Sequence, residues 1–275
     1  MKKKIKINFT DFWEGFNKTN NYFYNLLKNE FDVEISKSPD YIFFSVFGNQ
    51  HKQFKCKKIF YTGENFAPPL DYCDWSFSFD YLDDVRNYRF PIYLLDDVYY
   101  QLQREKVIEK SMASRKFCNF VASNGGCQER NDFVSQLSKY KKVDSGGRWM
   151  NNIGYAVSDK RKFQSEYKFS IAFENNTYRH QHPGYTTEKI VDPMTVNSIP
   201  LYWGNPLINR EFNTKSFVNF YDFHSKVDMI DHIIELDKND DKYLEMLKNP
   251  WLSEFNILED NKVENIKSFL YKILN

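Results

Sequence analysis

The 275-residue sequence contains no run of about 18 consecutive apolar residues, the length that a membrane-spanning helix needs. Its first residues are rich in lysine, as in a signal peptide. Thr10, Asp11, Trp13 and Glu14 nevertheless interrupt the segment before a sufficiently long apolar core develops. The sequence therefore predicts a protein without a transmembrane segment, and we expect the mature chain to begin at Met1.

The chain also lacks an excess of charge of either sign. Its 38 lysine and arginine residues are balanced by 37 aspartate and glutamate residues, which leaves a formal net charge of +1. A surface without a broad positive field does not favour binding to a nucleic-acid backbone or to an anionic membrane. We expect no nucleic-acid partner, so any anionic ligand has to be bound by a local group of side chains.

Cysteine is scarce and has no metal-binding spacing. Cys56, Cys73, Cys118 and Cys127 include no Cys-x-x-Cys pair, and they do not resemble a disulfide framework in a chain of this length. The sequence therefore predicts reduced thiols in a cytosolic protein.

Several signatures of catalysis and ligand binding are absent, namely GxGxxG, GxxxxGK[ST], HExxH, GxSxG and an Asp-x-Asp metal pair. His180 and His182 flank Gln181 and could bind a metal, but two histidines without a third ligand are more typical of a solvated loop. We therefore predict no metal site.

Aromatic residues, in contrast, are abundant. The sequence has 26 Phe, 19 Tyr and 5 Trp, which make up 18% of the chain, within a hydrophobic content of 41%. Such residues can form sugar-stacking surfaces, but they more often fill cores, and we favour the second interpretation for most of them. The hydrophobic content is sufficient for one large domain or two of ordinary size.

The first part of the chain predicts alternating strands and helices. Ile5, Ile7 and Phe9 alternate as in a strand, and residues 20–31 have apolar side chains at helical spacing with Thr19 as a candidate N-cap. Short apolar runs that end in Gly, Ser or Pro are typical of buried parallel strands. The sequence has three of them here, at residues 33–36, 41–48 and 58–63.

The alternation starts again after a charged, less hydrophobic segment at residues 96–116, so we place a domain boundary near residue 108. The second part predicts strands at residues 117–124, 167–174, 199–204 and 216–223, and helices at residues 129–140, near residue 160, and at residues 188–197 and 266–274. Two successive α/β units imply two parallel sheets, and ligands in such folds bind at the carboxyl ends of the strands. We expect the site in a cleft between residues 1–108 and residues 109–275.

The segment YTTEKI, at residues 185–190, predicts the start of a helix. Thr187 is suited to the N-cap position, and Glu188 and Lys189 then lie in the first turn. A lysine there opposes the helix dipole by a few tenths to about 1 kcal/mol, so it is better explained if an anion such as a diphosphate binds beside it. A solvated surface lysine is the alternative.

Two further segments contain polar residues next to glycine. In DSGGR, at residues 144–148, paired glycines allow close approach to a ligand and Arg148 offers bidentate donors to phosphate, although most Gly-Gly pairs are simple turns. In YTGEN, at residues 61–65, Glu64 follows a predicted buried strand at the carboxyl edge of a sheet. This position suits a general base, although an isolated loop carboxylate is the commoner case.

Several segments, taken together and in order, resemble the α-1,3-fucosyltransferases of glycosyltransferase family 10, and its bacterial members in particular. The resemblance runs through most of the chain and is strongest from Tyr167 to Phe223. The segments are IFYTGEN, RFPIYLL, FVASN, GGRWMNNIG, YKFSIAFEN, GYTTEKIVDPMTVNSIPLYWGNP and SFVNFYDF.

The resemblance implies the GT-B fold, which has two Rossmann-like α/β lobes, a cleft between them and here a C-terminal helix. It implies transfer of L-fucose, with inversion, from GDP-β-L-fucose to the 3-hydroxyl group of GlcNAc or Glc in a β-galactoside. Lewis-type glycans on lipopolysaccharide or another glycolipid, N-acetyllactosamine and lactose are such acceptors. GDP-fucose is then a co-substrate, and no cofactor is required, a divalent metal being at most stimulatory.

The resemblance also implies roles for individual residues. Residues 1–108 then form the acceptor-binding lobe, with Glu64 as the catalytic base, and residues 109–275 form the GDP-fucose lobe with the C-terminal helices. In the second lobe Asn175 and Tyr185 hold the nucleotide, Glu188 binds fucose, and Lys189 and Arg148 neutralise the diphosphate. The position of arginine in the Gly-Gly turn varies among members of the family.

Three aromatic residues of the first lobe, Trp13, Phe16 and Phe66, are candidates to stack on an acceptor sugar, with a core position as the equal alternative. The segment from Asn176 to Gly184 is longer than in the shortest relatives, and we consider it a candidate lid over the nucleotide. The basic tails that anchor some bacterial members are not found, so we expect a cytoplasmic protein and leave peripheral association with the inner membrane open.

Other functions stay open at this point. A GT-B transferase of another GDP-sugar is the nearest alternative. A non-catalytic protein that binds a GDP-sugar or a glycan is less favoured, because it would have no need to retain Glu64, Glu188 and Lys189 together. A purely structural α/β protein would leave the positions of Glu64 and Lys189 unexplained.

Overall fold

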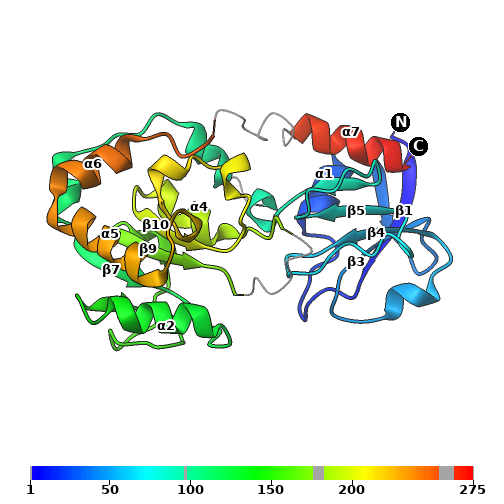
Figure 1. Cartoon of the computed structure of the whole chain (residues 1–275). Coiled ribbons are helices and arrows are strands. Elements are labelled where there is room, and N and C mark those ends of the chain that lie inside the picture. The colour runs from blue at the N-terminus through cyan, green and yellow to red at the C-terminus, as the bar shows by residue number, and fades with distance from the viewer. Residues whose placement is uncertain (1, 96–97, 176–182, 254–262, 275) are drawn as a thin grey trace. The chain divides into compact units, whose positions relative to one another are not determined.

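The computed structural model describes residues 2–95, 98–175, 183–253 and 263–274 (Figure 1). The chain divides into two compact units. Unit 1 consists of Met1–Leu95 together with Glu259–Asn275, and unit 2 of Asp96–Leu258. Each unit is built on its own parallel β-sheet, as predicted.

Unit 1 has a six-stranded sheet with the strand order β2-β1-β3-β4-β5-β6, and every pairing is parallel. Most side chains of the central strands are buried, as expected for a parallel sheet that is covered on both faces. The first four strands confirm the prediction, whereas β5 and β6 have no predicted counterpart. The strands are β1 (Lys4–Thr10), β2 (Asp32–Ile35), β3 (Tyr41–Phe44), β4 (Lys57–Tyr61), β5 (Trp75–Ser78) and β6 (Asn87–Arg89).

Helix α1 (Tyr22–Lys28) begins later than predicted. Its N-cap is Asn21, whose side chain accepts a hydrogen bond from the backbone N–H of Tyr24 at 3.0 Å. The predicted cap Thr19 is wrong, because its own backbone N–H donates to the Asn17 side chain at 2.9 Å in the preceding turn.

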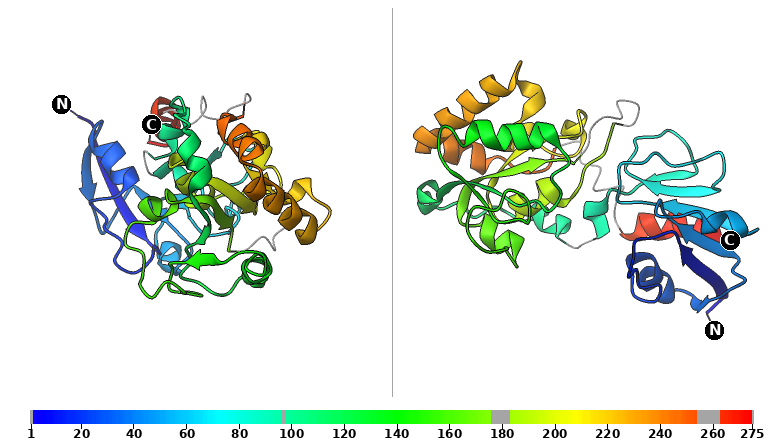
Figure 2. Two further views of the ribbon diagram at one scale, coloured as in Figure 1. Left: turned by 90° about the vertical axis from the view of Figure 1, so that its left-hand side faces the viewer. Right: turned by 90° about the horizontal axis from the view of Figure 1, so that it is seen from below.

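Helix α7 (Val263–Leu274) packs on unit 1, and the prediction that it belongs with the second lobe is wrong. Its buried face includes Ile266 and Leu270, and the ring of Phe269 lies 5.5 Å from Trp75 and 5.2 Å from Phe77. Figure 1 and the right-hand view of Figure 2 show this red helix beside the blue and cyan strands. Burial of this apolar face explains why the chain returns to the first sheet.

A buried carboxylate holds the loops at the end of β1 and β3. Asp11 accepts hydrogen bonds from the backbone N–H groups of Gln50 and His51, at 2.8 and 2.9 Å, and lies 2.6 Å from His51 Nδ1. Asp11 has a left-handed φ of 59°, and Gly48 packs so closely that a Cβ atom there would lie 2.5 Å from the Asp11 carboxylate. Asp11 therefore fixes the segment that follows β3.

Unit 2 has a five-stranded parallel sheet with the order β11-β10-β9-β7-β8. Its strands are β7 (Lys116–Phe120), β8 (Val143–Ser145), β9 (Tyr167–Phe173), β10 (Ile199–Trp203) and β11 (Val218–Asn219). Its α-helices within the described ranges are α2 (Gln128–Leu137), α3 (Lys160–Gln164), α4 (Glu188–Thr195), α5 (Lys226–Lys238) and α6 (Asp240–Lys248). The strand predicted at residues 216–223 is shorter in the structure, because a 3-10 helix begins at Phe220. Helices α5 and α6 have no predicted counterpart.

The predicted boundary near residue 108 is displaced, because the chain joins unit 2 directly after Leu95. Lys106 lies in the segment that follows, and its Nζ donates to the carbonyl oxygen of Leu247 at 2.9 Å and lies 3.1 Å from the ring centre of Trp251. The charged segment that indicated a domain boundary is thus anchored on unit 2.

The direction of chain progression reverses within the unit 2 sheet. The chain moves from β7 outward to β8 through α2, and then from β9 outward to β10 through α4 in the opposite direction. Since such crossovers are right-handed, α2 and α4 cover opposite faces of the sheet. The carboxyl ends of β7 and β9 therefore form a topological switch point, which is where α/β sheets bind ligands.

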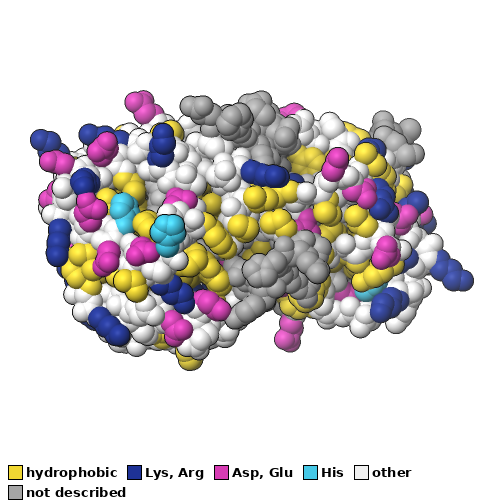
Figure 3. Space-filling model, in the orientation of Figure 1, with side chains coloured by type: hydrophobic (Ala, Val, Ile, Leu, Met, Phe, Trp, Pro, Cys, Tyr) yellow, Lys and Arg dark blue, Asp and Glu magenta, His cyan; other side chains and the backbone are white. Residues whose placement is uncertain are grey.

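The surface agrees with the balanced composition. On the face shown in Figure 3, basic and acidic side chains are interspersed and neither sign forms a continuous field.

None of the helices in the described ranges is both long and apolar enough to cross a membrane. The largest fully buried side chains are Tyr and Phe, apart from Arg130, so aromatic residues mainly fill the cores.

Candidate active site

A buried glutamate stands at the carboxyl edge of the unit 2 sheet. All seven residues of β9 are buried, and the chain continues into Glu174, whose side chain has no solvent exposure. The backbone N–H of Glu174 donates to the carbonyl oxygen of Trp203 at 2.9 Å. This bond fixes the carboxylate at the very end of a central strand.

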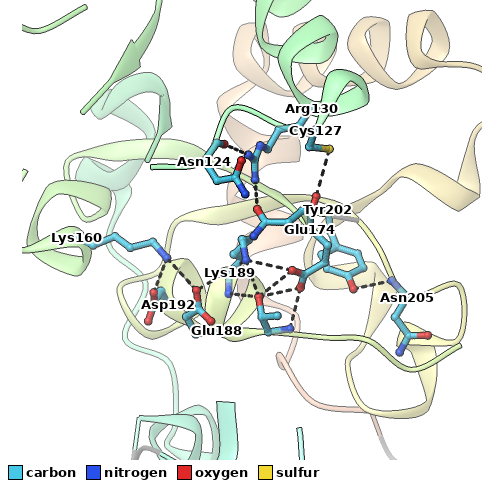
Figure 4. A network of polar contacts seen from close by, with 12 residues as sticks. Asn124, Cys127, Arg130, Lys160, Glu174, Glu188, Lys189, Asp192, Tyr202 and Asn205 are labelled. Atoms are coloured by element: carbon cyan, nitrogen blue, oxygen red, sulfur yellow. Dashed lines mark hydrogen bonds and ion pairs between the residues drawn. The ribbon is translucent and has the colours of Figure 1, made fainter. Parts of the chain in front are cut away.

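The first turn of α4 converges on Glu174, as Figure 4 shows. Thr187 donates to this carboxylate from its backbone N–H at 2.7 Å and from its hydroxyl group at 2.8 Å. The Nζ atom of Lys189 donates to Glu174 Oε2 at 3.2 Å and to Thr187 Oγ1 at 3.0 Å. The predicted N-cap is confirmed, since the Thr187 side chain accepts the backbone N–H of Lys189.

The ion pair between Lys189 and Glu174 explains why a lysine is tolerated at the start of α4. Burial acts to lower the pKa of Lys189, but Glu174 and Glu188 outweigh it and raise that pKa, so the ammonium group stays charged. Burial raises the pKa of Glu174, and Lys189 opposes the change. An ammonium group has three donors, of which Glu174 and Thr187 take two, and 20% of the Lys189 side chain remains exposed.

Glu188 lies beside this pair but is more accessible. Its side chain is 47% exposed, and its Oε1 atom is 3.9 Å from Lys189 Nζ and 4.0 Å from Lys160 Nζ. Lys160, at the start of α3, donates to Asp192 Oδ2 at 2.7 Å. Burial acts to raise the pKa of Glu188, but Lys189 and Lys160, together with hydrogen bonds from the Glu188 backbone and the Thr187 side chain, outweigh it and lower the pKa. Glu188 is therefore an ionised, accessible hydrogen-bond acceptor.

A buried arginine lies at the switch point between β7 and β9. Arg130 is 1% exposed, and its Nη1 atom donates to Asn175 Oδ1 at 2.5 Å while Nη2 donates to the carbonyl oxygen of Asn124. Asn124 follows β7 and Asn175 follows β9, so this guanidinium group ties the two strand ends together (Figure 4). Burial lowers the pKa of Arg130, but an arginine remains protonated at neutral pH.

Arg130 was not predicted as a site residue, although its position has the same signal as that of Lys189. Arg130 lies in the first turn of α2, where a basic residue opposes the helix dipole. The same signal in two helices that start at one sheet edge would have indicated a common anion site.

The turn after β10 closes against Glu174. A Cβ atom at Gly204 would lie 2.6 Å from Glu174 Cγ and 2.7 Å from the hydroxyl oxygen of Tyr202. That hydroxyl oxygen accepts the backbone N–H of Asn205 at 2.8 Å, and Asn205 Nδ2 donates to Thr186 Oγ1 at 3.1 Å. Glycine is required here because the turn approaches the buried carboxylate so closely.

The remaining predicted donor residues differ in their surroundings. Tyr185 is buried, with 8% of its surface exposed, immediately before the turn that leads into α4. Arg148 is exposed, in a turn where Gly147 packs so tightly that a Cβ atom would meet the backbone of Ala122. The structure therefore brings Asn175, Glu188 and Lys189 into one network and leaves Arg148 outside it. The candidate lid residues 176–182, including Arg179, His180 and His182, lie outside the described residues.

In unit 1, Glu64 lies where it was predicted. It is exposed three residues beyond the end of β4, and its backbone N–H donates to Thr62 Oγ1 at 3.1 Å. A carboxylate at the carboxyl edge of a parallel sheet is accessible to a ligand that binds there.

Exposed aromatic side chains lie on the same edge of unit 1. Trp13 is 46% exposed after β1, Phe47 is 51% exposed after β3, and Phe66 is 42% exposed after β4. Phe16 is only partly exposed and stacks on Phe12 with ring centres 4.1 Å apart. Trp13 and Phe66 therefore have the exposure that a stacking role needs, Phe47 is a further exposed candidate that was not predicted, and Phe16 mainly supports the loop.

Two surface hollows of unit 1, of about 520 and 530 Å³, lie at the opposite, amino edge of its sheet. They share Lys57 and Asp74, which pair with each other at 2.8 Å.

Within the described ranges no three His, Cys, Asp or Glu side chains are grouped so that they could hold a metal ion.

Family models cover both units. The model of the Alpha-(1,3)-fucosyltransferase FucT N-terminal domain matches residues 7–96, and that of Glycosyltransferase family 10 (fucosyltransferase) C-term matches residues 110–270.

The chain belongs to glycosyltransferase family 10.

Among family 10 proteins, the chain is 34% identical over 273 residues to Alpha-(1,3)-fucosyltransferase FucT of Helicobacter pylori. The match covers 84% of this chain and 56% of that protein, so the chain spans little more than half of that relative's length. A crystal structure of α1,3-fucosyltransferase superposes with a TM-score of 0.85 at 27% identity, covering 99% of this chain and 90% of the other. A structure of α1,3-fucosyltransferase with GDP-fucose superposes with a TM-score of 0.83 at 28% identity, covering 100% of this chain and 91% of the other. The predicted fold class, GT-B with two Rossmann-like α/β lobes, is confirmed.

Proposed function

We propose that this family 10 protein is an inverting α-1,3-fucosyltransferase that uses GDP-β-L-fucose and a β-galactoside acceptor. The observation that carries the proposal is the network of Arg130, Asn175, Glu188 and Lys189 at the switch point of unit 2. Two basic side chains and the amino end of α4 offer positive charge there, and Glu188 offers an acceptor for hydroxyl groups. This combination suits a nucleotide diphosphate sugar, and the fold relative with bound GDP-fucose supports the same ligand.

The proposed reaction is a direct displacement at C1 of fucose. The 3-hydroxyl oxygen of the acceptor forms a bond to C1, the bond from C1 to the phosphate oxygen breaks, and GDP leaves. Glu64 takes the proton of the hydroxyl group, as a general base. Lys189 and Arg130 stabilise the negative charge that develops on the diphosphate.

We propose that no metal ion is required. Arginine, lysine and a helix N-terminus can together provide the charge stabilisation that a divalent cation provides elsewhere. Glu174 contributes indirectly, because its ion pair holds Lys189 in place. Arg148 remains a proposed second contact to the diphosphate, on the basis of the family resemblance alone.

The acceptor is proposed to bind at the carboxyl edge of unit 1. Glu64, Trp13, Phe47 and Phe66 all follow strands that end at this edge, and aromatic faces stack on the apolar faces of sugars. N-acetyllactosamine and lactose represent the proposed acceptor class, and Lewis-type glycans on a glycolipid are the products expected from larger acceptors of this class.

The test is fucosyl transfer from GDP-fucose to N-acetyllactosamine and to lactose in EDTA. Three proteins are compared, namely wild type, Glu64→Gln and the control Glu245→Gln, which alters an exposed carboxylate on α6. We expect product from wild type and the control, and a loss of about 100-fold or more in Glu64→Gln with GDP-fucose binding retained. Product only with another GDP-sugar, or binding without transfer to any β-galactoside, would contradict the proposal.

A further inference from the structure

We propose that Lys160, held by Asp192, is a positioning residue that keeps the Glu188 carboxylate ionised and oriented toward the hydroxyl groups of the bound donor. The inference rests on the proposed function, because it assumes that Glu188 contacts GDP-fucose. It assigns a role to α3, an element that the family resemblance left without one.

The arrangement of charges on α4 makes this lysine necessary. Glu188 and Asp192 are four residues apart, so their carboxylates lie on the same side of the helix and repel each other. Lys160 projects from α3 to both of them, as Figure 4 shows. Its Nζ atom is 2.7 Å from Asp192 Oδ2 and 4.0 Å from Glu188 Oε1. The ammonium group therefore offsets a repulsion that would otherwise move Glu188.

The two distances give the two carboxylates different functions. A separation of 2.7 Å is a charge-assisted hydrogen bond, so Asp192 anchors Lys160. A separation of 4.0 Å is too long for a hydrogen bond, so Lys160 attracts Glu188 without occupying its lone pairs. The Asp192 side chain is 15% exposed and that of Glu188 is 47% exposed. Glu188 thus remains open to a ligand, while Asp192 is committed to the protein.

Among the described residues, the charges around Glu188 come from three elements. Lys160 faces it from α3, Lys189 and Asp192 from α4, and Glu174 from the end of β9. Lys189 is already paired with Glu174 at 3.2 Å, and Lys160 is the second lysine that lowers the pKa of Glu188. Removal of Lys160 should therefore make Glu188 easier to protonate and weaken donor binding most at low pH.

The experiment measures kcat/KM for GDP-fucose from pH 5 to pH 8 in wild type, Lys160→Met and Lys160→Arg. The matched control is Lys162→Met, on the same helix, where the lysine side chain is exposed. We expect a defect of about fivefold at pH 5 in Lys160→Met that falls below twofold at pH 8. Lys160→Arg, which retains the charge, should restore most of the activity at pH 5, and Lys162→Met should match wild type.

A merely structural role for Lys160 predicts a different result, namely a defect of equal size at every pH. That outcome, or a profile of Lys160→Met that is identical to wild type, would overturn the inference. If thermal melts show Lys160→Met to be unfolded, Lys160→Gln, which can still donate to Asp192, is compared in its place. Failure of the proposed function is distinguishable, because wild type itself would then transfer no fucose to these acceptors at any pH.

Discussion

The Nζ atom of Lys189 lies 3.2 Å from Oε2 of Glu174, a carboxylate with no solvent exposure. A lysine in the first turn of a helix is stabilised by a nearby negative charge, and here the protein supplies one itself. The ion pair does not exclude a bound diphosphate, since one donor of Lys189 is not used by Glu174 or Thr187. The ion pair holds the Lys189 ammonium group in position before any ligand binds, so binding costs less side-chain conformational entropy.

Replacement of Lys189 by Met should lower stability as well as donor binding. The substitution leaves Glu174 buried without its cation, which is expected to cost about 3 kcal/mol in the free energy of unfolding at pH 8. Chemical denaturation measures this change, with Lys162→Met as the control for loss of a lysine.

The deficit of Lys189→Met should be smaller at pH 5 than at pH 8. Burial raises the pKa of Glu174, so the folded state binds this proton more tightly than the unfolded chain does. The resulting stabilisation is present at low pH and is lost as the pH rises from the ordinary value through the raised pKa. Without Lys189 to oppose the rise in the Glu174 pKa, the free energy of unfolding depends more steeply on pH. A deficit that is equal at both pH values would show that Glu174 does not titrate as described.

Replacement of Arg130 by Lys should weaken GDP-fucose binding by about tenfold or more. Lysine retains the charge but cannot donate from a planar fork to both Asn175 and the carbonyl oxygen of Asn124. Isothermal titration with GDP-fucose measures the effect, and Arg148→Lys is the comparison. A larger loss in Arg148→Lys than in Arg130→Lys would favour the role that the family resemblance gives to Arg148.

Replacement of Gly204 by Ala should destabilise unit 2. The added Cβ atom would lie 2.6 Å from Glu174 Cγ, so either the turn or the carboxylate has to move, at a cost of about 1–3 kcal/mol. Gly126→Ala is a suitable control, because its Cβ atom would meet only the flexible Asn124 side chain at 3.1 Å. Thermal melts of both variants check the difference, and equal melting temperatures would contradict the packing argument.

Replacement of Asp11 by Asn should lower the stability of the protein by about 2 kcal/mol at pH 7, since the carboxylate accepts charge-assisted hydrogen bonds from Gln50 and His51. Burial acts to raise the pKa of Asp11, but these hydrogen bonds outweigh it and lower the pKa. The stabilisation is therefore present above the ordinary pKa and is lost as the pH falls through the lowered one. Urea denaturation should show a smaller difference between variant and wild type near pH 3 than at pH 7.

Local patterns in the sequence predicted much of the fold. Buried strands such as β9 are continuous apolar runs, and Thr187 is a cap that depends only on its immediate neighbours. Glu64 was predicted at a sheet edge because a strand and a glycine precede it. These features are encoded within a few residues, so they can be read without knowledge of distant contacts.

Contacts between distant segments could not be predicted in the same way. The partner of Lys189 is 15 residues earlier in the chain, directly after an apolar strand that gives no sign of a buried anion. Arg130 and Asn175 are 45 residues apart and meet only because β7 and β9 are neighbours in the sheet. The docking of α7 likewise depends on the shape of unit 1, because its amphipathic pattern does not specify which sheet it covers.

The position of α7 has a consequence for the order in which the protein is made. Unit 2 is a continuous stretch of chain, whereas unit 1 needs a helix that leaves the ribosome only after all of unit 2. Until then, the surface around Trp75 and Phe77 lacks Phe269 and stays in contact with water. During synthesis the unit that begins first is therefore completed last.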